Sequence, residues 1–166
     1  MIKDTARKPL AGLVVGIALA ASVGNYEGFS STPYHATPDE PFLTLGYGST
    51  RHSDGTPIKS TDRITREEAA KLMQGELEGY KKLMIKCVKV PLYQYEFEAY
   101  ASLTYNIGPT NFCNSTLVKK LNQQDYQGAC KEILKWDKQK GKTLKGLTAR
   151  RQDEYLTCTG SKGESK

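Results

Sequence analysis

The sequence predicts an α+β protein in which a small lobe of β-hairpins precedes a larger helical lobe. Residues 28–64 are rich in Gly, Pro, Ser and Thr and contain the β-type run 42–48, a composition typical of hairpins and loops. Residues 65–156 instead carry apolar side chains at helical spacing. The chain of 166 residues is long enough for one domain of two lobes. Because the join between two lobes is a natural cleft, we expect the functional site there.

The charge of the chain favours an anionic partner. Lys and Arg number 24 against 18 Asp and Glu, which gives a formal net charge of +6. Nucleic acid, anionic lipid and acidic cell wall would all satisfy this preference. The sequence contains no cluster of basic residues with interleaved aromatics, which makes nucleic acid the weakest of the three. We expect a monomer that binds no nucleic acid.

The N-terminus combines basic residues with an apolar stretch. Lys3, Arg7 and Lys8 precede the uncharged run 9–26, an order that would hold the N-terminus in the cytoplasm. A run of about 18 residues is near the lower limit for crossing a hydrocarbon core of ~30 Å. Its many Gly and Ala residues also make it weakly apolar. Four interpretations stay open: a cleavable signal peptide ending in the small-x-small pattern 18–20, a permanent anchor, a span that later leaves the membrane, and an ordinary buried helix.

The rest of the chain reads as a series of short elements. The dipeptide Asp54-Gly55 predicts a hairpin turn. Thr65 followed by Glu68 is typical of a capping box at a helix start. Apolar spacing predicts helices over residues 65–83, 95–105, 115–121, 125–136 and 147–156.

Three further local features complete this reading. Gly141 and Gly146 bracket an expected loop, and Trp136 is expected in the core. Residues 159–166 are polar and read as a flexible tail.

The four cysteines favour disulfides over a metal site. Cys87, Cys113, Cys130 and Cys158 form no CxxC pair, and both histidines are far from them in the sequence. An even number in a chain with a possible export segment indicates two disulfides. Of the three possible connectivities we favour Cys87 with Cys113 and Cys130 with Cys158. Each loop would then hold about 25 to 30 residues and contribute roughly 3 to 4 kcal/mol.

Glu27 is the carboxylate best placed for acid chemistry, because it stands alone at the end of the apolar run. Hydrolysis of a glycosidic bond needs a proton donor for the leaving oxygen and a second group that positions water or stabilises the oxocarbenium-like state. Partial burial would raise the pKa of such a carboxyl and keep it protonated near neutral pH. The alternative is a solvated residue at a helix end.

An ordered set of motifs resembles the phage lysozymes (endolysins) of glycoside hydrolase family 24. The resemblance covers about residues 20 to 158 and, in its N-terminal run, is similar to the signal-anchor-release type. The motifs are Glu27-Gly28, Tyr34, Thr44-x-Gly46-x-Gly48, Ile64-Thr65-x-x-Glu68-Ala69, Tyr105-Asn106-Ile107-Gly108, Ser115-Thr116-Leu117 and Gly146-Leu147-x-x-Arg150-Arg151.

The resemblance implies a lysozyme-like fold and a catalytic set of Glu, Asp and Thr. Glu27 matches the general acid, and Thr44 matches the threonine that helps to arrange the attacking water. The interval between them is two residues longer than the usual pattern, so no carboxylate falls on the expected position. Asp39 is the nearest match, Glu40 adjoins it, and a site without this carboxylate is the third possibility. His35, in the same loop, is expected to be merely exposed.

The same resemblance implies contacts to the substrate. Tyr34 and Tyr47 are candidates for stacking on sugar faces. Tyr105 and Asn106 match a cleft-facing helix end that would bind an acetamido group or the catalytic water, although Asn-Ile-Gly also simply ends helices. Arg150 matches an arginine near the catalytic glutamate, against the alternative of Arg150 and Arg151 as a surface pair.

These inferences combine into one functional hypothesis. Residues 1–24 would be a signal-anchor segment that becomes the first helix, residues 25–158 the catalytic domain and residues 159–166 a tail. The enzyme would cut the β-1,4 bond between N-acetylmuramic acid and N-acetylglucosamine in peptidoglycan without a cofactor or metal. It would first be tethered to the inner membrane and then be released into the periplasm. A lytic transglycosylase, a membrane-tethered wall-binding module and a cationic permeabiliser are the alternatives.

Overall fold

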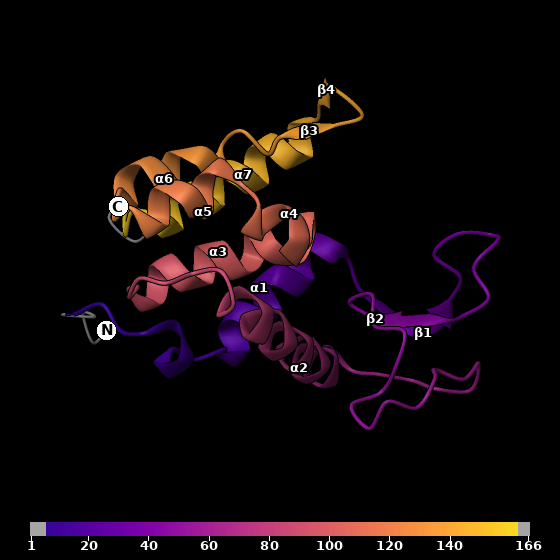
Figure 1. The fold of residues 1–166 in the computed structure, drawn as a ribbon. Coiled ribbons are helices and arrows are strands. Elements are labelled where there is room, and N and C mark those ends of the chain that lie inside the picture. Colours follow the sequence, from indigo (N-terminus) through magenta and orange to yellow (C-terminus); the bar gives the residue numbers. More distant parts are fainter. Residues whose placement is uncertain (1–5, 163–166) are drawn as a thin grey trace. The chain divides into compact units, whose positions relative to one another are not determined.

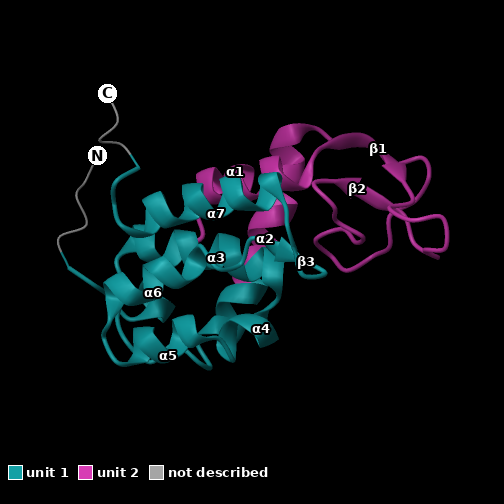
Figure 2. Cartoon of the chain, turned by 90° about the horizontal axis from the view of Figure 1, so that it is seen from above, with its two compact units in different colours: residues 1–14, 79–166 teal, residues 15–78 magenta. Residues whose placement is uncertain are grey.

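The computed structural model describes residues 6–162, so Lys3 and the end of the predicted tail lie outside the described residues. The chain forms two compact units (Figure 2). Unit 2 is the continuous segment 15–78, and unit 1 is formed by the described parts of residues 1–14 and 79–166. The predicted α+β class is confirmed, because helices in both units are accompanied by small antiparallel hairpins.

Unit 2 carries the first helix and the larger hairpin (Figure 1). Its elements are α1 (Ile17–Glu27), β1 (Ser30–Tyr34), β2 (Thr44–Gly46) and most of α2 (Arg66–Met84). The strands β1 and β2 are antiparallel, with Ser30 opposite Gly46, Tyr34 opposite Thr44 and an irregular register between these pairs. The predicted capping box is confirmed at α2, where the Glu68 backbone N–H donates to Thr65 Oγ1 at 3.2 Å and the Thr65 N–H donates to Glu68 Oε2 at 2.8 Å.

The predicted turn at Asp54-Gly55 is also present in unit 2. Gly55 has a φ of +84°, and the Asp54 carboxylate accepts the Thr56 backbone N–H at 2.9 Å. Arg51 and Pro57 form an antiparallel bridge on either side of this turn.

Unit 1 is mostly helical (Figure 1). Helix α3 packs against α4 and α7, and α6 packs against α5 and α7. The apolar side chains of α3 that are buried include Phe97 and Leu103. The elements are α3 (Gln94–Ile107), α4 (Pro109–Cys113), α5 (Thr116–Asn122), α6 (Tyr126–Ile133), β3 (Lys138–Gln139), β4 (Lys142–Thr143) and α7 (Lys145–Cys158).

Two disulfides close unit 1 with the favoured connectivity. Cys87 is bonded to Cys113, and Cys130 is bonded to Cys158. The sequence separations are 26 and 28 residues. The pairing preferred from the sequence is therefore confirmed.

The N-terminal segment differs from the expected single helix. Residues Leu10–Gly12 form a 3-10 turn, residues 13–16 are not helical, and α1 begins only at Ile17. Helix α1 has Gly16 as its N-cap in an extended conformation. None of the helices found in residues 6–162 combines the length and the apolar character that crossing a membrane requires.

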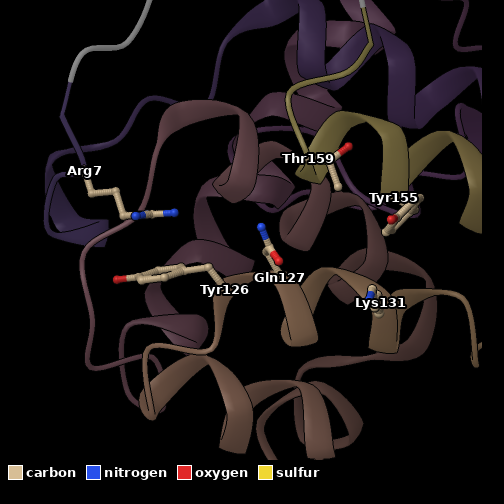
Figure 3. A pocket seen from close by; sticks show the side chains of 6 residues that line it. All are labelled: Arg7, Tyr126, Gln127, Lys131, Tyr155 and Thr159. Atoms are coloured by element: carbon tan, nitrogen blue, oxygen red, sulfur yellow. The ribbon is translucent and has the colours of Figure 1, made fainter.

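Residues 6–14 are held on unit 1 by a dense set of contacts. Lys8 and Leu92 form an antiparallel bridge through two backbone hydrogen bonds of 2.8 Å. Arg7 donates to both carboxylate oxygens of Glu96, at 3.0 and 2.7 Å. The Arg7 guanidinium lies 3.5 Å from the Tyr126 ring centroid and 4.4 Å from that of Tyr93. Figure 3 shows Arg7 and Tyr126 together at the edge of a pocket of about 380 Å³.

Three smaller expectations need correction. The helix predicted over 125–136 ends at Ile133. The loop predicted between Gly141 and Gly146 instead contains strand β4 of the short hairpin β3–β4 and the start of α7. Lys140 and Gly141 both have positive φ, which is the conformation of a two-residue hairpin turn. Trp136 is half-buried rather than in the core. In the predicted tail, the backbone N–H groups of Ser161 and Lys162 donate to Leu156 and continue the end of α7.

Candidate active site

Glu27 is the last residue of α1. The helix ends there because Gly28 adopts a φ of +81°, a conformation that glycine takes without the steric cost of a Cβ. The Glu27 side chain is exposed, so the partial burial predicted from the sequence is wrong. The carboxylate is therefore presented at the surface of unit 2 by the end of a helix.

The last turn of α1 packs directly against the ring of Tyr47, the residue that follows β2. Gly24, three residues before Glu27, is buried against Tyr47, and a Cβ added at Gly24 would lie 2.6 Å from that ring. The Phe29 ring meets the Tyr47 ring edge-on, with centroids 5.5 Å apart. These contacts fix the end of α1, and with it Glu27, relative to the β1–β2 hairpin.

Thr44 lies on the hairpin that α1 contacts. It begins β2, is 4% exposed, and stands opposite Tyr34 in the ladder. Tyr34 is 40% exposed and keeps a ring surface available to a sugar. Tyr47 is 4% exposed and packed between Gly24 and Phe29, so the prediction that its ring stacks on a sugar is wrong.

Asp39 and Glu40 lie in the loop 35–43 that joins β1 to β2. Asp39 is exposed, as is His35. Glu40 is half-buried, and its Oε2 atom is shielded from solvent with no hydrogen-bond partner among the residues that the structure describes. Both carboxylates that the sequence offered are thus present in unit 2, together with Glu27 and Thr44.

The other predicted substrate contacts, Tyr105, Asn106 and Arg150, belong to unit 1. Tyr105 is half-buried, and its ring centroid lies 5.2 Å from that of Tyr80. Asn106 is exposed one residue before the end of α3, and Gly108, with a φ of +86°, caps that helix. The Asn-Ile-Gly motif therefore ends the helix and leaves Asn106 exposed, and the binding of substrate by Asn106 stays a prediction.

Arg150 and Arg151 do not form a surface pair, because they are 5% and 0% exposed. Both bind Glu154, Arg150 through Nε at 3.1 Å and Arg151 through Nε at 2.7 Å. Burial raises the pKa of the Glu154 carboxyl, while the Arg151 charge, a 2.6 Å hydrogen bond from Ser102 and the Arg150 charge act in the opposite direction. This cluster sits between α3 and α7, the helices that pack against each other in unit 1.

A pocket of about 400 Å³ opens beside Asn106 in unit 1. It combines apolar walls, side-chain amides and one lysine. Its lining residues are Asn106, Ile107, Asn111, Trp136, Lys138, Gln139, Leu144 and Leu147. Aromatic and apolar surface with a few polar groups is the usual composition of a site that binds a small ligand.

The sequence reasoning missed Arg151, Glu154 and Asn111. A signal for the first two existed, because Glu154 follows the two arginines at the helical spacings i+3 and i+4. No local signal in the sequence marks Asn111, which lines the same pocket as Asn106. Within residues 6–162, no group of three or more His, Cys, Asp or Glu side chains is arranged to hold a metal ion.

Comparison with known proteins places the chain in a family. A family model described as phage lysozyme matches residues 24–154. The chain is 35% identical to an endolysin of Bacillus phage B103, covering 87% of this chain and 52% of that protein, so it spans about half of that relative's length. It is 34% identical to a SAR-endolysin of Enterobacteria phage P21, covering 92% of this chain and 94% of that one.

A solved structure shares the fold. The endolysin from Escherichia coli O157:H7 phage FAHEc1 superimposes with a TM-score of 0.76 at 30% identity, covering 94% of this chain and 98% of that one. The lysozyme-like fold expected from the sequence motifs is confirmed by this likeness.

Proposed function

Because this chain belongs to the phage lysozyme family, we propose that it is an endolysin that hydrolyses the β-1,4 bond between N-acetylmuramic acid and N-acetylglucosamine in bacterial peptidoglycan. Membership makes it a glycoside hydrolase of the lysozyme type that lyses cell walls. The exact bond and the roles of individual residues are our proposal. The positive net charge of the chain agrees with an acidic polymer as substrate.

The contact of Gly24 with Tyr47 is the observation that carries this proposal. It seats the end of α1 on the hairpin, so that Glu27 and Thr44 belong to one packed framework rather than to two independent segments. A reacting pair must be held in a fixed geometry to act on one bond. The packing of Gly24 against the Tyr47 ring holds the helix end that carries Glu27 in such a fixed position.

In the proposed reaction, Glu27 donates its proton to the glycosidic oxygen as the bond to the anomeric carbon breaks. A water molecule then attacks the oxocarbenium-like centre and loses a proton to a carboxylate. We assign that carboxylate to Asp39 and the second hydrogen bond to this water to Thr44. Tyr34, exposed opposite Thr44, would stack on the sugar.

Substitution of single carboxylates tests this assignment. Glu27→Gln should abolish release of reducing sugar ends from isolated, membrane-free peptidoglycan while wall binding and the unfolding midpoint stay unchanged. Asp39→Asn should lower turnover strongly, and Glu40→Gln should lower it little. Glu67→Gln, which removes an exposed carboxylate in α2, is the matched control and should retain full activity.

The products of wall digestion distinguish hydrolysis from lytic transglycosylation. Mass spectrometry of the digested wall should find N-acetylmuramic acid with free reducing ends. Anhydromuramic ends would mean that a lytic transglycosylase mechanism replaces hydrolysis. Full activity in the Glu27→Gln variant would remove Glu27 from the catalytic role and overturn the proposal.

We also propose that residues 1–24 first tether the enzyme to the inner membrane and that the tethered form is inactive. In this scheme residues 10–24 span the membrane, and on release into the periplasm residues 17–27 form α1 and seat Glu27. The likeness to a SAR-endolysin over 92% of the chain supports it. In this scheme the contacts of Arg7 and Lys8 with Glu96 and Leu92 would form only after release.

Two glycines make a sharp test of tethering. A Cβ added at Gly12 or Gly16 would meet nothing within 4 Å, so both positions admit the first atom of a side chain, and leucine there raises the apolarity of the segment. The double variant Gly12→Leu/Gly16→Leu should remain in the membrane fraction and delay lysis, because leucine favours the bilayer over glycine. Lysis as prompt as that of the parent would contradict the scheme.

A further inference from the structure

A pocket of about 380 Å³ in unit 1 is formed where the N-terminal segment meets α6 and α7 (Figure 3). Helix α6 contributes Gln127 and Lys131, which lie four positions apart and therefore share one face of the helix. Tyr155 and Thr159, at the end of α7, have the same spacing. The pocket thus has one wall from each of the two helices.

Arg7 closes the pocket at the start of α6. Its guanidinium lies 3.5 Å from the centroid of the Tyr126 ring and donates to Glu96 through Nε and Nη2. A guanidinium has five N–H donors. The Nη1 group of Arg7 donates to none of residues 6–162, so donors of this lining residue remain for a ligand.

The cations Arg7 and Lys131 stand at separate places along α6. Arg7 covers Tyr126, the first residue of the helix, and Lys131 follows five positions later, which is about 7.5 Å along the helix axis. Figure 3 shows Gln127 between them. Cations that recognise a single phosphate group converge on it, whereas this arrangement offers a positive charge at each end and an amide in the middle.

The lining also carries polar side chains that are available to a ligand. Lys131, Gln127 and Tyr155 make no side-chain hydrogen bond or ion pair with any other residue in the described part of the chain. Thr159 donates its hydroxyl hydrogen to the Leu156 carbonyl at 3.2 Å, so it faces a ligand as an acceptor. The lining that the structure describes includes no Asp or Glu, which leaves the charge of Lys131 for an anion.

From this arrangement we propose that the pocket binds a short acidic peptide, with one carboxylate at Arg7, a second at Lys131 and a backbone amide on Gln127. Hydrogen bonds from Arg and Lys to a carboxylate are charge-assisted and strong, and a side-chain amide can both donate to and accept from a peptide bond. The inference rests on the proposed function, because bacterial cell wall carries short peptides with free carboxylates. It adds a peptide contact in unit 1 to the cleavage of the glycan strand.

Binding at this pocket would be coupled to docking of the N-terminal segment, because Arg7 belongs to that segment. In the tethered form proposed above, Arg7 would lie on the cytoplasmic side of the membrane and the pocket would lack this residue. A peptide that binds only the complete pocket stabilises the docked segment by mass action. Wall peptides would therefore favour the released enzyme.

The first experiment removes one carboxylate at a time from a probe peptide. NMR titration of the full-length parent protein uses acetyl-Glu-Ala, acetyl-Gln-Ala and acetyl-Glu-Ala amide, of which the last two each lack one carboxylate. These two should bind about tenfold more weakly than the diacid. In the Lys131→Gln variant, the diacid should bind no more tightly than the monoacid whose missing carboxylate faced Lys131.

Lys119→Gln, which removes an exposed charge of α5 outside the pocket lining, is the matched control. It should leave all three affinities unchanged within about twofold. Failure of the diacid to bind the parent, or a Lys131→Gln variant that keeps the full preference for the diacid over both monoacids, would overturn the proposal. Binding of phosphatidylglycerol vesicles or inorganic phosphate in place of the peptide, abolished by Lys131→Gln, would assign the pocket to another anion and equally overturn it.

Hydrogen exchange tests the coupling to the N-terminal segment. The backbone N–H groups of Lys8 and Val14 donate to the Leu92 carbonyl at 2.8 Å and to Gln94 Oε1 at 3.0 Å. Their exchange through undocking should slow about tenfold when the diacid is present at ten times its Kd. The same peptide concentration should have little effect in the Arg7→Gln variant. Unchanged exchange in the peptide-bound parent would contradict the coupling.

Wall digestion separates this inference from the proposed function. Lys131→Gln should cut glycan strands stripped of their peptides at the parent rate, whereas on intact wall its KM should rise several-fold with kcat unchanged. Failure of the parent to digest isolated wall would overturn the proposed function whatever the peptide titrations show. Equal KM values of Lys131→Gln and parent on intact wall would overturn the peptide pocket alone.

Discussion

At the scale of single residues, the seating of α1 depends on the missing side chain of Gly24. A Cβ at this position would lie 2.6 Å from the Tyr47 ring, which is itself buried and cannot move outward freely. Gly24→Ala should therefore destabilise the protein by about 1–3 kcal/mol and lower turnover, because overpacking displaces the helix end that carries Glu27. Urea unfolding followed by circular dichroism, together with wall digestion, measures both effects.

The matched control is Gly75, another glycine inside a helix of the same unit. A Cβ there meets nothing within 4 Å, and the residue is exposed in α2. Gly75→Ala should stabilise the protein by about 0.5–1 kcal/mol, since alanine is the better helix former. If Gly24→Ala and Gly75→Ala destabilised the protein by similar amounts, steric contact with Tyr47 would not be the cause of the loss in stability.

Residue burial is what the sequence predicted least well. Tyr47 reads as one of several tyrosines near a glycine-rich hairpin, and only the packing of α1 shows that its ring is covered. Arg150 and Arg151 read as an exposed basic pair, yet the cost of burying them is offset by Glu154 and Ser102, which come from two different helices. Such compensation depends on tertiary contacts. Glu27, in contrast, was a candidate because of its place after the apolar run, and Thr44 because of the ordered motifs.

At the scale of elements, the pairing of Arg7 with Glu96 fixes the N-terminal segment on α3. Glu96 is 3% exposed at its side chain and also accepts the Tyr93 backbone N–H at the start of α3. Arg7→Gln removes the cation and leaves a buried carboxylate, which should cost about 1–3 kcal/mol of stability. Hydrogen exchange of residues 8–14 should become faster in this variant.

Lys8→Gln is the control for the lost charge. The hydrogen bonds between Lys8 and Leu92 run through the backbone, so this substitution leaves the bridge intact. It should change neither the stability nor the exchange rates appreciably. Equal effects of the two substitutions would mean that net charge, and not the pairing with Glu96, secures the segment.

The junction of α5 and α6 makes stability depend on pH. Hydrogen bonds from Lys120 and Lys135 lower the pKa of Glu132, which is 5% exposed in α6. A carboxyl whose pKa is lower in the folded state stabilises the fold above its unfolded pKa of about 4.3, and this contribution is lost as the pH falls through the folded value.

Glu132→Gln should accordingly be less stable than the parent at pH 7, and the difference should shrink as the pH falls below about 4.3. Urea unfolding at pH 7, 5 and 3 measures it. Glu67→Gln, which alters an exposed pair with Lys71, should show no comparable pH dependence. A constant difference between Glu132→Gln and the parent at all three pH values would contradict the assignment.

Elements with strong local signals were predicted well. The capping box at Thr65 and the apolar spacing that follows it located α2. The favoured pairing of the four cysteines also agrees with the observed disulfides. The hairpin β3–β4 was missed because two-residue strands of exposed polar side chains have no periodicity. The late start of α1 was missed because an uncharged run gives no boundary signal, whereas the contacts of residues 6–14 with unit 1 favour a non-helical path.

At the scale of the whole molecule, both disulfides lie in unit 1 and close loops of similar size. Chain-entropy arguments give each about 3.5 kcal/mol of stabilisation. Reduction with dithiothreitol should therefore lower the stability of unit 1 far more than that of unit 2. Residue-specific hydrogen exchange in reducing and non-reducing buffer tests this, and equal loosening of α1 and α6 would contradict it.

The path of the chain through the two units has a consequence for the order of folding. Unit 2 is one uninterrupted segment, whereas unit 1 joins residues before position 15 to residues after position 78. Arg7 is separated from Glu96 by 89 positions, so this contact must wait until most of the polypeptide has been made and carries the entropy of a long closed loop. Unit 2 can therefore acquire its native contacts early in synthesis, whereas Lys8 and Arg7 gain Leu92 and Glu96 only after the whole of unit 2 has been made.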